Sequence, residues 1–260
     1  MKKFDADDLD ARSPQQIERI LPLVRWYTQR YVRLQVTGLE HLQPGPVLTV
    51  GNHNGGICGP DLLATLGVLW GTLGVAEPLY ALAHDFAMQQ LTPLGRALQP
   101  FGALRASADN AARALERGAR VLVYPGGDLE AYRHYRERDR IVLGERRGYL
   151  RVARSTHAAI QPLVVHGAHR SALIFSEGRR LARALSLQRW ARLQRFPMAL
   201  CLPWGLALGP WLPYLPLPLS LRMRILPKTW LAANESIEHA HARITRSMQL
   251  ALDELAREAS

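Results

Sequence analysis

Short, mostly apolar runs recur along this chain and predict the strands of a buried sheet. A strand that is covered on both faces shows no alternation of polar and apolar residues, so its usual signature is a brief apolar run between turn-forming residues. An edge strand is also expected, and it should end at Gly38. The expected strands cover 32–36, 47–50, 79–82, 120–124, 160–165 and 221–226.

Between these runs, apolar residues recur every three or four positions, which predicts helices with one buried face. The helix ends carry proline in the first turn, serine or asparagine at the N-cap, or glycine just past the last turn. The expected helices cover 14–30, which Pro14 begins; 62–70, which Gly71 ends; the stretch between the cap Ser107 and Gly118; 147–154; and a last helix capped by Asn234, with the inward stripe Ile237, His241, Ile244, Met248, Leu252 and Leu255.

Strands and helices alternate throughout, which predicts an α/β fold: a single domain with a mostly parallel central sheet flanked by helices. The 260 residues are enough for one large core. We expect an N-terminal helical segment over 1–31, an α/β domain over 32–232, and a C-terminal helix within 233–260 that packs on the domain. Functional loops of such sheets gather where the strands end.

The loop after the run 47–50 carries candidate chemistry, because His53 is followed eight positions later by Asp61. A neutral imidazole can take a proton from a hydroxyl, while a carboxylate on its far nitrogen fixes the tautomer. In the alternative interpretation, His53 bonds to the main chain and Asp61 caps the following helix. His53 could also work with Asp85, or without a carboxylate. The distance between the ring and the Asp61 carboxylate decides between them.

Two other loops are expected at the same edge of the sheet. The sequence PGGDLEAYR follows the run 120–124 and has a glycine pair that allows close approach of a main chain. The sequence HGAHRS follows the run 160–165. Their candidate residues are Gly126, Gly127, Asp128, Glu130 and Arg133 in the first loop, and His166, His169 and Arg170 in the second.

The positive charge of the chain is local. Residues 133–154 contribute +5 and residues 170–195 contribute +6, which together equal the formal net charge of +11. This distribution favours an anionic partner. No basic tail, RNP-type strand or zinc-finger spacing points to nucleic acid, so anionic lipid headgroups or the phosphates of a carrier cofactor are expected instead.

The two cysteines, Cys58 and Cys201, match no metal spacing, and we expect no metal site. The first residues lack the apolar core of a secretory signal. We therefore expect a cytoplasmic protein, in the cytosol or on its membrane face.

Residues 196–221 form the longest uncharged stretch, and six prolines within it argue against a transmembrane helix. We expect an irregular apolar segment whose aromatic residues Trp204, Trp211 and Tyr214 favour the boundary between membrane and water. With the preceding arginines, it would make a monotopic contact with an anionic membrane surface. The competing interpretation is a buried cover over the core or over a substrate tunnel.

Taken together, the blocks GNHNGGICGPD, FGALRAS, VLVYPGGDLEAYR, GERRGYLRVARSTHAAIQPLVVHGAHRSALIFSEG and LPWGLALGPWLPYLPLP resemble the lysophospholipid/glycerolipid acyltransferase superfamily (PlsC-like). The similarity is greatest to a bacterial branch with a diacylglycerol acyltransferase-like PGG-x-x-E block, and it covers roughly 47–230. It implies the glycerolipid acyltransferase fold and a membrane-associated site without metal or bound cofactor. It also implies transfer of an acyl group from acyl-CoA or acyl-carrier protein to a hydroxyl of a glycerolipid, lysophospholipid or other lipid alcohol.

The same resemblance assigns roles to residues. His53 matches the catalytic histidine, and Asp61 is its partner at a longer spacing than the family usually has. Arg105 matches an arginine that binds the acceptor's phosphate, whereas Glu130 suggests an acceptor that lacks phosphate. The implied substrate-binding residues are Arg105, Gly126, Gly127, Asp128, Glu130 and Arg133.

We expect direct attack in a ternary complex, with an oxyanion donor near Gly126 or Gly127. No G-x-S-x-G motif supports a hydrolase. A catalytically silent membrane-surface protein that binds lipid is the other open alternative. The sequence does not fix the oligomeric state.

Overall fold

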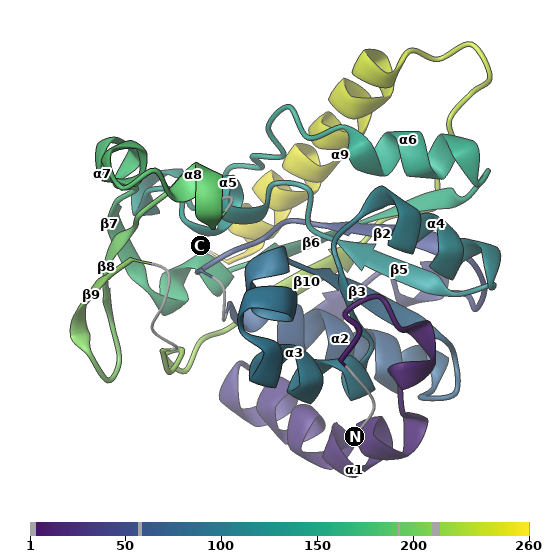
Figure 1. The fold of residues 1–260 in the computed structure, drawn as a ribbon, viewed down its shortest axis with the longest axis horizontal. Coiled ribbons are helices and arrows are strands. Elements are labelled where there is room, and N and C mark those ends of the chain that lie inside the picture. Colours follow the sequence, from purple (N-terminus) through teal and green to yellow (C-terminus); the bar gives the residue numbers. More distant parts are fainter. Residues whose placement is uncertain (1–3, 57–58, 192, 210–213, 260) are drawn as a thin grey trace.

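The computed structural model describes residues 4–56, 59–191, 193–209 and 214–259. A seven-stranded sheet forms the centre of this described part, in the order β1-β10-β6-β2-β5-β3-β4 (Figure 1). Neighbouring strands are parallel, except that β10 runs antiparallel to β6. The strands are β1 Gln35–Thr37, β2 Val47–Gly51, β3 Leu79–Ala83, β4 Ala103–Arg105, β5 Arg120–Val123, β6 Ala159–His166 and β10 Arg222–Ile225. The chain is thus a single α/β domain with a mostly parallel sheet, as predicted.

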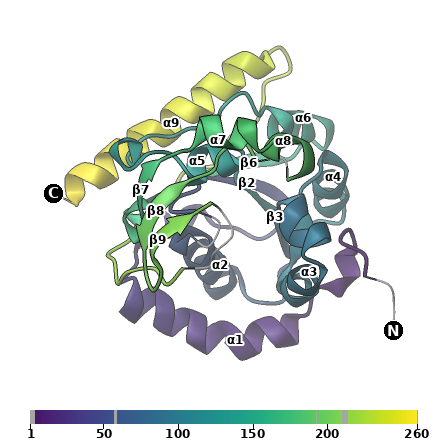
Figure 2. The same ribbon diagram turned by 60° about the vertical axis from the view of Figure 1, so that its left-hand side comes forward.

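Helices cover both faces of the sheet (Figure 2). One apolar core lies between the sheet and α4, α6 and α9, and a second lies between the sheet and α1 and α2. The helices are α1 Pro14–Trp26, α2 Pro60–Leu73, α3 Thr92–Leu98, α4 Ala108–Glu116, α5 Gly127–Ala131, α6 Gly148–Ser155, α7 Arg179–Ala184, α8 Leu187–Trp190 and α9 Ile237–Glu258. Short 3₁₀ or π turns cover Leu9–Ala11, Tyr27–Tyr31, Leu39–His41, Phe86–Gln90, Gln99–Phe101, Tyr135–Glu137 and Ala168–Ser171.

Burial in the middle of the sheet explains the short, mostly apolar runs of the sequence. Every residue of β2 and β6 is buried, because helices cover these strands on both faces. In the sheet order, β6, β2 and β5 are neighbours and run parallel to one another. Their following loops, HGAHRS, GNHNGG and PGGDLEAYR, therefore meet at one edge, as the sequence predicted.

The antiparallel strand β10 brings a further segment of the chain to this edge. Arg222 at the start of β10 pairs with His166 at the end of β6. The segment that leads into β10 consequently enters the sheet at the carboxyl ends of the parallel strands, beside the histidine loop.

Several predicted boundaries are wrong. The strand expected over 32–36 is β1, which begins only at Gln35. The first helix matches its predicted range 14–30, because the π turn Tyr27–Tyr31 follows α1 directly. The cap of α9 is Ser236, not Asn234, because the Ser236 hydroxyl lies where it accepts the His239 N–H. The short strand β4 was not predicted.

A second, three-stranded antiparallel sheet corrects the first half of the segment 196–221, which was predicted to be irregular, whereas residues 214–221 contain no helix or named strand, as predicted. The second sheet contains β7 Leu173–Ser176, β8 Met198–Cys201 and β9 Gly205–Leu208, in that order. Pro197 precedes β8 and Pro203 lies in the turn between β8 and β9, so neither removes a donor from the sheet. Trp211 lies outside the described residues.

None of the helices in the described ranges combines the length and the apolarity needed to cross a bilayer.

Candidate active site

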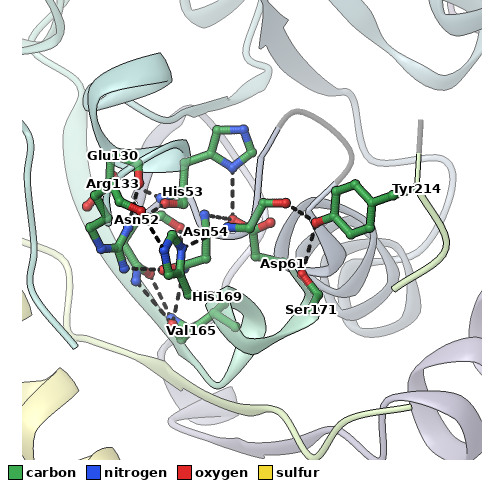
Figure 3. A network of polar contacts seen from close by, with 11 residues as sticks. Asn52, His53, Asn54, Asp61, Glu130, Arg133, Val165, His169, Ser171 and Tyr214 are labelled. Carbon is green, nitrogen blue, oxygen red and sulfur yellow. Dashed lines mark hydrogen bonds and ion pairs between the residues drawn. The ribbon is translucent and has the colours of Figure 1, made fainter. Parts of the chain in front are cut away.

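His53 and Asp61 face each other at the carboxyl edge of the sheet. The Asp61 Oδ2 lies 3.0 Å from His53 Nδ1, within hydrogen-bond distance (Figure 3). His53 follows β2, whereas Asp61 lies in the first turn of α2. The pairing predicted from the sequence is confirmed, and neither Asp85 nor a solitary histidine is needed.

Glycines in the described part of the loop between the two residues help to accommodate the long spacing. Gly55 and Gly56 have φ values of +74° and +83°, a conformation that glycine adopts without strain. The Gly56 N–H donates to the Ala131 carbonyl at 2.9 Å, and the Gly59 N–H donates to the Gly56 carbonyl at 3.1 Å. Cys58 lies outside the described residues.

Asp61 is held by the loop as well as by the histidine. Its side chain is fully buried, and its Oδ2 also accepts the Asn54 N–H at 2.9 Å. The N-terminus of α2 adds a favourable field for a carboxylate. A charged acceptor on Nδ1 keeps the proton on that nitrogen, so Nε2 carries the lone pair.

The His53 Nε2 points away from this network (Figure 3). Within 4–56, 59–191, 193–209 and 214–259, no residue hydrogen-bonds to it, and the side chain is 15% exposed. Burial lowers the pKa of His53, but the adjacent Asp61 charge and hydrogen bond outweigh this, and the pKa lies above the ordinary 6.5. The pair thus presents a basic nitrogen toward an incoming group.

Tyr124 holds the histidine ring from one side. The two rings stack at a centroid distance of 4.9 Å. A methyl group at Gly51, the last residue of β2, would lie 2.5 Å from the Tyr124 ring. Glycine at this position therefore lets the tyrosine lie against the strand end and support His53.

Glu130 supports the main chain of the histidine loop. One carboxylate oxygen accepts the His53 N–H at 2.9 Å, and the other accepts the Val142 N–H at 2.9 Å. Glu130 is 0% exposed, and its burial raises the pKa of the carboxyl group while the nearby Arg133 charge lowers it. The residue joins two loops, and its oxygens face the protein.

Arg133 supports the same loop from below. Its guanidinium donates to the His53 carbonyl at 2.9 Å, to the Glu130 carbonyl at 2.7 Å and to the Asn54 side chain. It also donates to two carbonyls in the following turn. Arg133 is 1% exposed, and burial lowers its pKa. All these partners fix the position of the main chain around His53.

His169 and Asn52 tie the loop after β6 to the same network. His169 Nδ1 accepts the Gly55 N–H at 3.0 Å, so its Nε2 carries the proton and donates to the Arg133 carbonyl at 2.9 Å. Burial lowers the pKa of His169 to about 3, which keeps the ring neutral. The Asn52 amide exchanges two hydrogen bonds with the main chain of Val165.

The substrate-binding roles of Glu130 and Arg133 stay predictions. Both side chains are buried, and in this structure their polar atoms bond to the protein, including the main chain of His53. Asp128 is likewise buried, paired with Arg146 and accepting a main-chain N–H.

The glycine pair is also occupied. The Gly127 N–H donates to the Tyr124 carbonyl at 3.1 Å, so it is not an open oxyanion donor. Gly126 is in close contact with Glu130, because a methyl group there would lie 2.5 Å from the carboxylate.

The remaining predicted residues lie outside this network. Arg105, on β4, forms a two-pronged ion pair with Asp7, with its Nε 2.7 Å from the carboxylate, and its binding role stays a prediction. His166 is buried 3.3 Å from Asp139, and Arg170 is exposed. Within the described ranges, no group of three or more His, Cys, Asp and Glu side chains is arranged to hold a metal ion.

Sequence reasoning missed several residues of the site. The Tyr214 hydroxyl donates to the Gly55 carbonyl and lies 2.9 Å from the Ser171 hydroxyl (Figure 3). Asn52 and Asn54, on either side of His53, bond to the loops beside them. The asparagines were an available signal, because buried amides between two glycine-rich turns usually bond to main chain. Tyr214 was expected at the boundary between membrane and water, and no local pattern pointed to the site, since its partners lie far away in the sequence.

The sequence is similar to those of known proteins. A family model described as Acyltransferase matches residues 33–166. The chain is 27% identical over 69% of its length to the uncharacterized proteins ML2427 of Mycobacterium leprae and Rv0502 of Mycobacterium tuberculosis. The match covers 49% of the first and 50% of the second, so the chain spans about half the length of these curated relatives.

Among solved structures, the fold is similar to the 1-acyl-sn-glycerophosphate (LPA) acyltransferase PlsC from Thermotoga maritima. The TM-score is 0.56 at 14% sequence identity, and the match covers 93% of this chain and 79% of that chain. At this identity the likeness concerns the fold.

Proposed function

Because the chain belongs to the acyltransferase family, we propose that it transfers a fatty acyl group from an acyl thioester to a hydroxyl group of a lipid. The observation that carries the proposal is the His53–Asp61 pair, whose ring nitrogen Nε2 is left without a partner among the described residues. A base of this kind suits a reaction in which a hydroxyl must lose its proton while it attacks a carbonyl.

The proposed reaction is direct attack. The acceptor hydroxyl gives its proton to Nε2 of His53 as its oxygen bonds to the thioester carbon, and Asp61 stabilises the imidazolium that forms. The carbon–sulfur bond then breaks, and the thiolate takes the proton from His53. The chain supplies no covalent intermediate in this scheme, so one transfer consumes one thioester and one hydroxyl.

We infer the donor from the charge of the chain and the acceptor from the solved structure with a similar fold. The basic segments 133–154 and 170–195 include the loops beside the site, which favours a phosphate-bearing donor such as acyl-CoA or the phosphopantetheine of acyl-carrier protein. The acceptor is a glycerolipid, lysophospholipid or other lipid alcohol. PlsC is named for 1-acyl-sn-glycerophosphate, which is therefore the first acceptor to try. We place the reaction at the cytoplasmic face of the inner membrane.

The test is release of free thiol by the purified full chain from a long-chain acyl-CoA or acyl-carrier protein, with a panel of lysophospholipid, diacylglycerol and fatty-alcohol acceptors in detergent. The acylated product is identified by mass spectrometry. His53→Ala should abolish acceptor-dependent release, and the control His239→Ala, which changes an exposed histidine on α9, should not.

A catalytically silent lipid-binding protein is the second candidate, because the basic segments would serve it equally well. Lipid binding that survives His53→Ala, with no thioester consumed by the wild-type chain over the whole panel, would establish that candidate instead.

A further inference from the structure

The three-stranded sheet turns apolar side chains outward. Leu173, Leu200 and Leu206 lie directly opposite one another on β7, β8 and β9, with exposures of 41%, 49% and 54%. Met198 and Leu208 form the next pair on the same face, and Phe175 is exposed beside the irregular register of β7. We call this surface the leucine face; its residues are Leu173, Phe175, Met198, Leu200, Leu206 and Leu208.

The inner face of the same sheet carries smaller side chains. Ile174, Ala199 and Ala207 are buried, and the first two pack against Ala131 and Tyr132 at the end of α5. An antiparallel sheet with one face in water normally places polar residues on that face. Here the larger apolar residues lie outside, and Ser176, which pairs with Met198 after the bulge of β7, is the polar residue beside them. Such a contiguous apolar surface indicates an interaction site.

Exposed arginines lie in the segment that connects β7 with β8. Arg180 and Arg183 lie on α7 and Arg189 lies on α8, next to the small sheet (Figures 1 and 2). In the part of the chain that the structure describes, no carboxylate forms an ion pair with these three residues. Leu181 and Leu185, between them, are also exposed. Positive charge beside an apolar surface complements an anionic headgroup layer over an acyl layer.

The turn between β8 and β9 extends the apolar surface. Leu202 and Trp204 in this turn are 47% and 49% exposed. Tryptophan favours the boundary between headgroups and acyl chains. An anionic bilayer uses both features, because its headgroups are negative and its interior is apolar.

We propose that the leucine face docks on an anionic lipid bilayer, with Leu200 and Leu206 at its centre and the arginines of α7 and α8 at the headgroups. The choice of a lipid surface as the partner rests on the proposed function. The contact is made by an ordered sheet, not by the irregular segment that the sequence suggested. Because the inner face of this sheet packs on α5, the bilayer would lie one layer away from the loop that holds His53.

The experiment is co-sedimentation of the full chain with phosphatidylglycerol-rich vesicles and with pure phosphatidylcholine vesicles, at low and high salt. The double variant Leu200→Glu/Leu206→Glu should lower the partition coefficient on anionic vesicles by about tenfold or more, since it removes apolar area and adds negative charge. The matched control is Leu250→Glu on α9, whose leucine is 57% exposed on another side of the molecule. It should bind like wild type. Circular dichroism shows whether each variant is folded.

Four outcomes would overturn the docking surface. Wild type that does not sediment with anionic vesicles removes it, as does a folded double variant that binds like wild type. Loss of binding in Leu23→Glu/Trp26→Glu alone would assign docking to α1, where these residues are 65% and 53% exposed. A wild-type dimer that the double variant dissociates would make a second copy the occupant.

Acyl transfer to acceptors in detergent micelles separates this proposal from the proposed function. The double variant should retain wild-type rates there, because it changes no residue of the site. Vesicle binding without transfer by wild type would refute the function and keep the surface. Transfer by wild type, with vesicle binding unaffected by the double variant, would support the function and refute the docking surface.

Discussion

Arg120 and Arg133 are both buried, but Arg120 lies at the amino ends of the parallel strands and Arg133 at their carboxyl ends, which we call the amino edge and the carboxyl edge of the sheet. Their partners differ. Arg120 begins β5, at the amino edge. Its guanidinium donates to Thr49 on β2 at 2.9 Å and to Gln161 on β6 at 2.8 Å. Burial lowers its pKa to about 10, and no carboxylate of the described residues forms an ion pair with it. Arg120 therefore joins three neighbouring strands through neutral groups.

Arg133 lies at the carboxyl edge, and its partners belong to loops. It donates to the carbonyls of His53 and Glu130, close to the Glu130 carboxylate that holds the His53 N–H. The comparison shows one residue type in two structural roles. At the amino edge an arginine stabilises the sheet, and at the carboxyl edge an arginine with a nearby opposite charge fixes a loop that holds the reactive ring.

The largest expected effect is that of Asp61→Asn at the carboxyl edge. An asparagine can still accept from the Asn54 N–H, but it no longer stabilises an imidazolium and it allows the wrong tautomer of His53. We expect kcat for acyl transfer to fall about 10²- to 10⁴-fold, with the free energy of unfolding changed far less. Steady-state kinetics and urea unfolding measure the two quantities. Near-normal kcat would show that the carboxyl edge, like the amino edge, has only a structural role.

The second effect is that of Arg133→Met. Removal of the guanidinium leaves the Glu130 carboxylate buried without its nearby charge, which we expect to cost about 3–5 kcal/mol of unfolding free energy. The folded fraction should also lose activity, because the His53 and Asn54 groups that Arg133 holds are freed. If the folded variant had wild-type kcat, the positioning role assigned to Arg133 would be wrong. A shift of KM alone would instead point to substrate binding.

Arg120→Met should have a smaller effect of a different kind. Thr49, Gln161 and the Gln43 carbonyl, which also accepts from Arg120 at 2.7 Å, lose their donor, at about 1–3 kcal/mol. The desolvation of a buried charge is removed at the same time. We expect lower stability with unchanged kcat per folded molecule. Thermal unfolding and activity of the same preparation make the test. A loss of kcat comparable with that of Arg133→Met would erase the distinction between the two edges.

The smallest effect concerns pH. The pKa of His169 is about 3 in the folded chain against an ordinary 6.5, so the unfolded chain binds more protons below pH 6.5 and stability falls as pH falls. The slope from this residue is about 1.4 kcal/mol per pH unit at most. His169→Gln keeps an acceptor and a donor, and it should flatten the stability profile between pH 6 and 5. Identical profiles in urea titrations would contradict the buried neutral state of His169.

The sequence predicted the sheet best where helices cover it on both faces. The strands β2, β5 and β6 contain short, mostly apolar runs, because their residues are largely buried, and the polar exceptions Thr49 and Gln161 bond to Arg120. The pairing of His53 with Asp61 was also predictable, because both residues belong to one short segment. In contrast, the sheet containing β8 and β9 was missed, because prolines in turns and prolines in strands look the same until the register is known.

The support of His53 could not be predicted for a different reason. Glu130 and Arg133 were identified as candidates, but charged residues after a glycine pair suit a ligand as well as a buried network. Only tertiary structure shows that their partners are main-chain groups of another loop. Tyr214 and Ser171 depend on contacts between segments far apart in sequence, and no spacing rule connects them.

The antiparallel direction of β10 makes the stretch from Gly167 to Ser220 a closed excursion from the sheet. It leaves at the end of β6 and returns at the same edge, where a methyl group on Gly167 would lie 2.7 Å from the Ser220 carbonyl. The excursion carries the leucine face, α7, α8 and Tyr214, yet its two ends meet. This unit can therefore be exchanged between relatives without rethreading the core, provided that the incoming unit keeps a partner for the Gly55 N–H in place of His169 and a donor to the Gly55 carbonyl in place of Tyr214.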